Sequence, residues 1–127
     1  MSDKPVTQKL LIKENCKALI VNEPEDYRST LGELPQNATL LSMSTEPVDL
    51  VQVFVTSSQE LEARLPGLKK ALKPKGILWV TYPKGTSKTK ANINRDSIRE
   101  YARSIGLEAI AMVSVDETWS ALRLKAI

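Results

Sequence analysis

Short apolar runs separated by polar turns occur at intervals along the whole chain. The runs at 18–21 and 48–55 are almost continuously apolar, a pattern typical of strands buried on both faces of a sheet. Runs of a similar kind predict further strands at 38–43, 77–82, 107–115 and 119–125. In chain order, the pattern therefore predicts six strands.

Amphipathic stretches fill most of the intervals between these strands. They predict a short helix at 6–12 and longer helices at 24–32, 57–72 and 94–105. Ser57 and Glu60 have the spacing of a capping box, in which each side chain bonds the backbone N–H of the other residue. Pro66 interrupts the third helix and predicts either a kink or two short helices there.

The alternation of strands and helices predicts the fold class. Short connections between alternating elements imply right-handed crossovers, parallel strands and helices on both faces of the sheet. A tight turn joins the fifth and sixth strands, so the sixth runs antiparallel. We therefore predict a single α/β domain over residues 1–127. It is a three-layer Rossmann-like sandwich with a mostly parallel six-stranded sheet in the order 2-1-3-4-6-5.

The composition narrows the chemistry that the chain can perform. The 127 residues include no histidine, which excludes Ser-His-Asp and Cys-His catalysis and histidine-ligated zinc. Cys16 is the single cysteine, so neither an intrachain disulfide nor a multi-cysteine metal site can form, and we predict no metal. Any acid–base chemistry would have to use Asp, Glu, Lys, Tyr or Cys.

Charge and hydropathy bear on the partners and the location. The net charge of +3 is mild and 5% of the residues are aromatic, whereas nucleic-acid binders more often combine a basic stripe with stacking aromatics. No apolar stretch approaches the roughly 20 residues of a membrane span, and no signal-peptide pattern precedes the domain. We therefore expect a cytoplasmic protein whose partner is neither a membrane nor, in the first place, a nucleic acid.

The order of the elements resembles a reduced class I methyltransferase fold. In methyltransferases a strand that begins with an acidic residue is likewise followed by a helix and a Leu-Lys-Pro-Gly-Gly turn into the next strand. Here Asp49 opens such a strand, and residues 72–76 read Leu-Lys-Pro-Lys-Gly. The terminal hairpin at 107–125 also matches the last two strands of those enzymes.

A closer resemblance is to a family of short bacterial proteins of unknown function. It covers residues 10–125 and runs through 19–24, 82–84 and 116–123. These stretches read Leu-Ile-Val-Asn-Glu-Pro, Tyr-Pro-Lys and Asp-Glu-Thr-Trp-Ser-Ala-Leu-Arg. The last of the three is the most specific. This resemblance implies the fold and no particular activity.

Two places depart from the methyltransferase pattern. Methyltransferases have a Gly-rich turn after the first strand, where the backbone approaches S-adenosylmethionine, whereas residues 22–26 read Asn-Glu-Pro-Glu-Asp. They also carry an acid at the end of the second strand for the ribose hydroxyls, whereas the first acid available here is Glu46. The departures count against S-adenosylmethionine. The acidic turn and the missing G-x-G-x-x-G count against NAD and FAD, so the sequence assigns no cofactor.

A candidate site follows from the predicted order of the strands. Ligands of open α/β sheets bind beyond the carboxyl ends of the strands, where the strand order reverses. That point lies between the first and third strands, and four loops reach the same edge. These loops bring together the candidate ligand-binding residues Asn22, Glu23, Ser57, Tyr82, Lys84, Asp116, Glu117 and Trp119.

Each of these residues has a functional and a structural interpretation. Lys84 would bind an anionic group, and Trp119 would form an apolar wall. Asp116 or Glu117 would accept a proton or bind an amine. Structurally, Asp116 and Glu117 would only close a turn, and Trp119 would pack in the core. Lys84 would then be solvated or paired with Glu117, and Glu23 would be a helix N-terminal charge.

Three classes of function stay open. The first is a non-catalytic Rossmann-like module that binds a small molecule or a protein partner at the carboxyl edge of the sheet. The second is an atypical S-adenosylmethionine-dependent, methyltransferase-like enzyme that uses Asp116, Glu117, Tyr82 and Lys84. The third is nucleic-acid binding through the lysine-rich loop 84–90, for which a merely solvated loop is the structural alternative. The sequence assigns no catalytic residue and no oligomeric state.

Overall fold

A computed structural model describes residues 6–25, 27–32, 34–42, 46–84, 93–116 and 118–126. Its strands are β1 (Lys17–Val21), β2 (Thr39–Leu41), β3 (Val48–Phe54), β4 (Leu72–Pro83), β5 (Leu107–Ser114) and β6 (Trp119–Ala126). Its helices are α1 (Val6–Lys9), α2 (Tyr27–Leu31), α3 (Ser58–Lys70) and α4 (Arg95–Ser104). In this part of the chain, no helix is long and apolar enough to cross a membrane.

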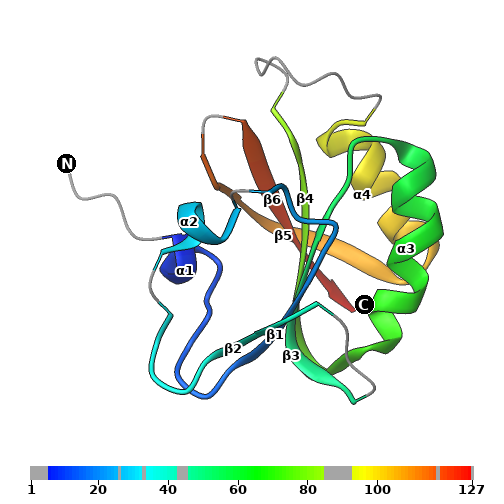
Figure 1. The fold of residues 1–127 in the computed structure, drawn as a ribbon. Helices are drawn as coiled ribbons and strands as arrows, with labels where there is room; N and C mark the ends of the chain where they lie inside the picture. The colour runs from blue at the N-terminus through cyan, green and yellow to red at the C-terminus, as the bar shows by residue number, and fades with distance from the viewer. Residues whose placement is uncertain are drawn as a thin grey trace.

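The strands form one sheet in the order β2-β1-β3-β4-β6-β5. β1 pairs in parallel with β2 and β3, and β3 pairs in parallel with β4. β6 runs antiparallel to both of its neighbours, β4 and β5. Helices α3 and α4 cover one face of the sheet, and the shorter α1 and α2 lie on the other (Figure 1). The predicted Rossmann-like fold class, strand order and antiparallel last strand are confirmed.

Two hydrophobic cores lie on opposite faces of the sheet. Alternate residues of β3 supply both: Val51 and Val53 join the core beneath α3 and α4, whereas Leu50 and Phe54 join the core beneath α1 and α2. Because both faces are covered, β3 is apolar almost throughout, which explains its continuous hydrophobic run. Cys16 is buried in the second core.

A buried hydrogen bond helps to hold the N-terminal segment against the sheet. The indole Nε1 of Trp79, a buried residue of β4, donates to the carbonyl of Leu10 at 2.9 Å. Leu10 follows α1 directly and is fully buried in the same core as Trp79. An indole N–H in a core needs such a partner, so this contact fixes where the short α1 packs.

The ends of α3 and α4 show one predicted cap and one correction. Asn94 caps α4, with its Oδ1 accepting from the Ser97 N–H at 2.9 Å. Ser57 caps α3 as predicted, with its hydroxyl accepting from the Glu60 N–H at 3.1 Å. The second half of the predicted capping box is wrong. The Glu60 carboxylate bonds the N–H of Thr56 instead of that of Ser57.

Helix α3 runs unbroken through Pro66, so the prediction of two short helices is wrong. Proline lacks the N–H that would bond the carbonyl four residues earlier, which here belongs to Glu62. The hydroxyl of Tyr101 on α4 donates to that carbonyl at 3.4 Å. The contact supplies a partner from the neighbouring helix where the helix itself has none.

Strand β4 begins at Leu72, earlier than the strand predicted at 77–82. Leu72 pairs with Val48, and the next pair joins Ile77 to Leu50, so the residues between them form a bulge in the strand. A Cβ atom on Gly76 would lie 2.6 Å from Leu72 Cγ. The glycine therefore allows Leu72 and Gly76 to approach each other closely within the bulge.

Candidate functional site

The carboxyl ends of the parallel strands align at one edge of the sheet. Val21 of β1 pairs with Val53 of β3, which pairs with Val80 of β4, which pairs with Leu122 of β6. The chain leaves β1, β3 and β4 and enters β6 beyond this row. The turn after β1 and the β5–β6 turn therefore lie at the same edge, which we call the carboxyl edge.

Asn22 and Glu60 close the gap between the ends of β1 and β3. The Asn22 amide Nδ2 donates to the Phe54 carbonyl at 2.9 Å and to Glu60 Oε2 at 3.0 Å. Glu60 Oε1 accepts from the backbone N–H and the hydroxyl of Thr56, at 2.9 and 2.7 Å. The bonds from Thr56, and then that from Asn22, lower the pKa of Glu60. The carboxylate is therefore charged at neutral pH and already engaged within the protein.

Asp116 holds the turn between β5 and β6. Its Oδ1 accepts from the backbone N–H groups of Thr118 and Trp119, both at 2.8 Å, in the manner of an Asx-turn. The Lys84 N–H donates to the Thr118 carbonyl at 2.8 Å, and the Lys84 ammonium donates to the Ser114 hydroxyl at 2.6 Å. The end of β4 is thereby fixed to the hairpin.

Three aromatic rings pack together beneath this edge, on the α1/α2 face. The Phe54 ring packs edge-on against Tyr27, with centroids 4.6 Å apart, and against Trp119, with centroids 5.1 Å apart. Burial raises the pKa of Tyr27, and the charges of Glu23 and Asp116 raise it further. The carboxylates of Glu23 and Asp116 are thus close enough to this aromatic cluster to raise the pKa of its tyrosine.

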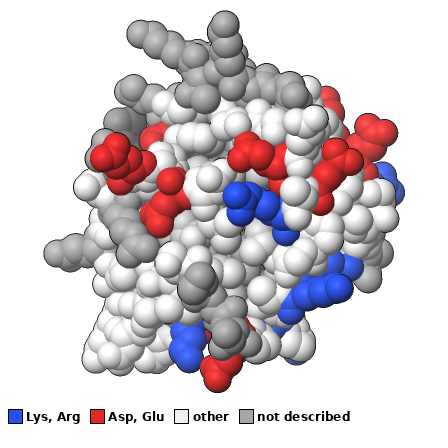
Figure 2. Space-filling view, turned by 45° about the vertical axis from the view of Figure 1, so that its right-hand side comes forward, with Lys and Arg blue, Asp and Glu red and all other residues white. Residues whose placement is uncertain are grey.

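Acidic side chains gather toward one end of the molecule. Figure 2 shows Asp and Glu mostly over the upper half of the face that it draws, with most Lys and Arg over the middle and lower parts. Such a separation of charge favours cationic ligands at the acidic end and anionic ligands at the basic end. Within the described residues, no group of three or more His, Cys, Asp or Glu side chains could hold a metal ion.

Two of the sequence-predicted site residues have structural roles: the Tyr82 side chain is buried, and the Ser57 side chain bonds the backbone of α3. Tyr82 is only 6% exposed and belongs to the core beneath α3 and α4, on the opposite face from Trp119. Its hydroxyl donates to the sulfur of Met112 at 3.3 Å, and burial raises its pKa. The Ser57 hydroxyl is used as the cap of α3. Neither side chain is brought together with Trp119 and Asp116.

Glu117 and the loop residues 85–90 lie outside the described residues. Sequence reasoning missed the roles of Glu60, Tyr27 and Phe54 at this edge. The capping-box spacing pointed to Glu60 but assigned its carboxylate to the wrong N–H. Nothing in the local pattern around Tyr27 or Phe54 distinguishes them from ordinary core residues.

A model of the family described as "Protein of unknown function (DUF3052)" matches residues 22–127. The chain belongs to the DUF3052 family. The resemblance to short proteins of unknown function is thereby confirmed. No curated protein matches this DUF3052 member in sequence.

Solved methyltransferase structures share the fold. The DhpI–SAH complex aligns with a TM-score of 0.65 at 12% identity, covering 96% of this chain and 83% of DhpI. A SAM-dependent methyltransferase from Aquifex aeolicus aligns with a TM-score of 0.66 at 17% identity, covering 96% of this chain and 88% of the methyltransferase. Ribosomal protein L11 methylase from Lactobacillus delbrueckii subsp. bulgaricus aligns with a TM-score of 0.62 at 11% identity, covering 95% of this chain and 74% of the methylase. At such identities the similarity shows a methyltransferase-like Rossmann fold and no activity.

The residues at the β1–β3 gap do not fit S-adenosylmethionine as the fold implies. Ligands of Rossmann-like sheets approach the backbone closely at this point, but here the Asn22 side chain crosses it and bonds Glu60. At the end of β2, Leu41 and Ser42 offer no carboxylate for ribose hydroxyls. Among the described residues, the Asn22–Glu60 bond therefore occupies one side of the nucleoside position, and β2 ends without a carboxylate on the other side.

Proposed function

We propose that this protein is a non-catalytic Rossmann-like module that binds a small molecule with a cationic group at the carboxyl edge. The observation that carries the proposal is the closed gap between β1 and β3, where Asn22 and Glu60 bond each other. A ligand would have to break these bonds to reach the place of a nucleotide cofactor in this fold. The proposal therefore places the ligand beside the hairpin, next to Trp119 and Asp116.

The chemistry beside the hairpin favours a cation with an apolar body. Asp116 uses Oδ1 to hold the turn, and among the described residues no group bonds its second carboxylate oxygen. Trp119 is only partly buried, and its ring belongs to the aromatic cluster. An amine placed here would pair with the Asp116 carboxylate and lie against an indole, an arrangement that stabilises cations by about 0.5–2 kcal/mol through the ring alone.

Isothermal titration with 2-phenylethylamine tests the proposal, with 2-phenylethanol as the uncharged control. We expect the amine to bind and the alcohol to bind at least about tenfold more weakly, as loss of one charge-assisted contact implies. Asp116→Asn keeps an acceptor for the turn and removes the charge, so it should weaken amine binding alone. Glu62→Gln on exposed α3 is the matched control. Equal binding of amine and alcohol, or no effect of Asp116→Asn, would contradict the proposal.

A methyltransferase-like enzyme is the second candidate, favoured by the fold shared with the DhpI–SAH complex and a SAM-dependent methyltransferase. Titration with S-adenosylmethionine separates the two candidates. An enzyme should bind it in the wild-type protein and lose it in Glu23→Ala or Asp116→Ala. The non-catalytic module should show no binding up to millimolar ligand. Tight binding with methyl transfer to any acceptor would overturn our proposal.

A further inference from the structure

The outermost strand, β5, carries exposed apolar side chains. Among the described residues, the large hydrophobic side chains that are exposed are Ile110, at 45%, and Met112, at 49%. β5 is the last strand of the sheet, and in the described part of the chain it pairs only with β6. An outermost strand with exposed apolar side chains pairs readily with a further strand. These two side chains therefore point to a partner that extends the sheet at β5.

The backbone of β5 offers hydrogen-bonding groups on its outer side. The Val115 N–H donates to the Trp119 carbonyl at 3.0 Å, so the backbone groups of Val115 point toward β6. Successive residues of an antiparallel strand point these groups alternately toward the paired strand and away from it. Met112 and Ser114 therefore present theirs outward. The Lys9 ammonium of α1 donates to this outward carbonyl of Ser114 at 3.1 Å.

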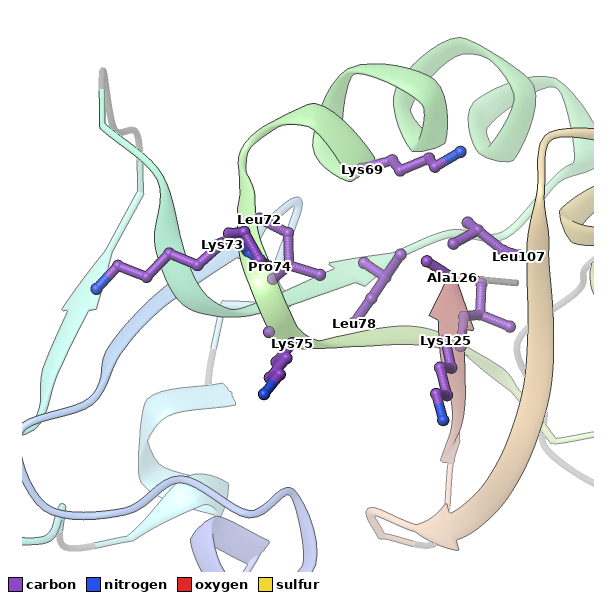
Figure 3. Close-up of a pocket in the computed structure, with 11 residues that line it drawn as sticks. Lys69, Leu72, Lys73, Pro74, Lys75, Leu78, Leu107, Lys125 and Ala126 are labelled. Atoms are coloured by element: carbon purple, nitrogen blue, oxygen red, sulfur yellow. The ribbon is translucent and has the colours of Figure 1, made fainter.

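The register of β5 places Glu108 on the face of the sheet on which α1 lies. Leu107 lines a pocket of about 410 Å³ beneath α3, whereas the next residue, Glu108, lies opposite Lys125. In Figure 3, Leu107 and Leu78 lie on the α3 side of the sheet, and Lys125 extends to the other side. Because paired residues share a face, Glu108 extends with Lys125. Exposed Glu108 and Lys9 are thus on one face, near opposite ends of β5.

Antiparallel pairing of β5 with β5 of a second copy brings these opposite ends together. In a two-fold symmetric dimer the same patch of each copy meets itself. A two-fold axis near Ala111 places Glu108 of one copy opposite the end of β5 at which Lys9 of its partner lies, and it does so twice. An ammonium has several N–H donors, so Lys9 can keep its bond to Ser114 and also bond this carboxylate. The charges are therefore self-complementary across the outer side of β5.

The same axis makes the apolar side chains self-complementary. Ile110 and Met112 lie on either side of Ala111, so pairing about Ala111 brings Ile110 of one copy opposite Met112 of its partner. Cross-strand contacts of this kind each contribute roughly 0.2–1 kcal/mol. A parallel arrangement would instead place Glu108 beside Glu108 of the partner, which is unfavourable because like charges repel.

We propose that the protein forms a symmetric dimer in which the two β5 strands pair antiparallel and join the two sheets into one. The register shift between Ala109 and Ala111 limits the length of regular pairing. The contact is therefore narrow, and the dimer dissociates on dilution, as small protein interfaces do. It runs along β5 and leaves the ligand site proposed beside Asp116 to each copy, so neither proposal depends on the other.

Sedimentation equilibrium of the full chain tests this dimer between about 1 µM and 1 mM. We expect the average mass to rise with concentration from that of one chain toward that of two. Ile110→Lys should raise the dissociation constant at least about tenfold, because it places a charge in the middle of the paired strands. Ala63→Lys adds the same charge on the exposed surface of α3 and should leave the dissociation constant unchanged.

Exchange of two charges tests the antiparallel orientation. Glu108→Lys and Lys9→Glu should each weaken the dimer several-fold, because each places like charges together. The combined variant Glu108→Lys/Lys9→Glu should recover most of the loss, because opposite charges face each other again. Damage to the fold would accumulate in the combined variant instead. Recovery therefore distinguishes a contact between copies from a loss of structure.

A cysteine near the two-fold axis locates the contact. Ala111→Cys should form a disulfide between copies under mild oxidation, because residues opposite each other in antiparallel strands have Cα atoms about 4.5–5.5 Å apart. Ala63→Cys is the control and should stay uncrosslinked, and the native Cys16 is buried in both proteins.

The proposal is overturned if the wild-type chain stays monomeric up to about 1 mM, or if Ile110→Lys associates as tightly as the wild type. Failure of the charge exchange to recover association would overturn it too. A dimer that crosslinks through Ala63→Cys and not through Ala111→Cys would place the contact elsewhere. A monomer that pairs β5 with an added peptide of unrelated sequence would assign this strand to a different protein partner and likewise overturn it.

Discussion

The amide of Asn22 and the carboxylate of Glu60, 38 residues apart in the chain, meet at 3.0 Å across the carboxyl edge. This contact joins the end of β1 to the first turn of α3. Glu60 also bonds Thr56, so the ends of β1 and β3 and the start of α3 share one carboxylate. In a fold whose ligands usually enter at this point, the protein uses the position for its own hydrogen bonds.

Two replacements of Asn22 separate the contribution of its side-chain hydrogen bonds to the free energy of unfolding from the contribution of its left-handed backbone. Asn22 has φ of 62°, which glycine adopts freely and alanine does not. Asn22→Gly should lower the free energy of unfolding by about 1–2 kcal/mol through the two lost side-chain bonds. Asn22→Ala should lower it by about 1 kcal/mol more through backbone strain. Urea unfolding measures both, and an alanine variant as stable as the glycine variant would show that the strain is absent.

The lowered pKa of Glu60 predicts a loss of stability in acid. Its folded pKa lies below the ordinary value of 4.5 because Thr56 and Asn22 donate to the carboxylate. The stabilising contribution is therefore fully present above pH 4.5 and is lost as the pH falls through the folded pKa. Urea unfolding between pH 7 and pH 3 should show a shallower decline for Glu60→Gln than for the wild type. Glu62→Gln, on the exposed face of α3, should retain the wild-type slope, and identical slopes for all three proteins would refute the prediction.

The sheet could be predicted from the sequence because its determinants are local. Each apolar run gives a strand, and the handedness of crossovers then limits the order of the strands. The face of the sheet on which each side chain at the carboxyl edge lies could not be predicted in the same way, because it depends on the register of the strands. Trp119 pairs with Pro83 and not with Tyr82, and paired residues share a face. The Tyr82 ring therefore lies beneath α4 while the Trp119 ring lies on the other side.

The Asn22–Glu60 contact could not be predicted from the sequence for a related reason. It requires a left-handed backbone at Asn22 and a particular approach of α3 to the end of β1. The spacing of Ser57 and Glu60 indicates a helix start but not which neighbouring donor the carboxylate selects. Tertiary placement puts the Thr56 hydroxyl and the Asn22 amide within reach, and these donors outcompete the local N–H.

A buried polar chain between the sheet and α2 gives a third prediction. The Tyr27 hydroxyl donates to Gln52 Oε1 at 2.7 Å, and Gln52 Nε2 donates to Thr81 Oγ1 at 2.9 Å, with Gln52 fully buried. Gln52→Leu would leave two buried hydroxyls without this partner, so it should lower the free energy of unfolding by about 2–4 kcal/mol. Adding Tyr27→Phe and Thr81→Val removes both hydroxyls. The triple variant should regain part of the loss in urea unfolding, whereas further destabilisation would show that packing, and not polar satisfaction, dominates here.

Relief of backbone strain at Lys75 gives a fourth prediction. Because Lys75 has φ of 66°, Lys75→Asn should raise the free energy of unfolding, measured in urea, by up to about 1 kcal/mol. Lys125→Gln, in extended strand, should leave the stability unchanged to within about 0.5 kcal/mol. If Lys75→Asn instead lowered stability, the lysine would be contributing to the fold itself.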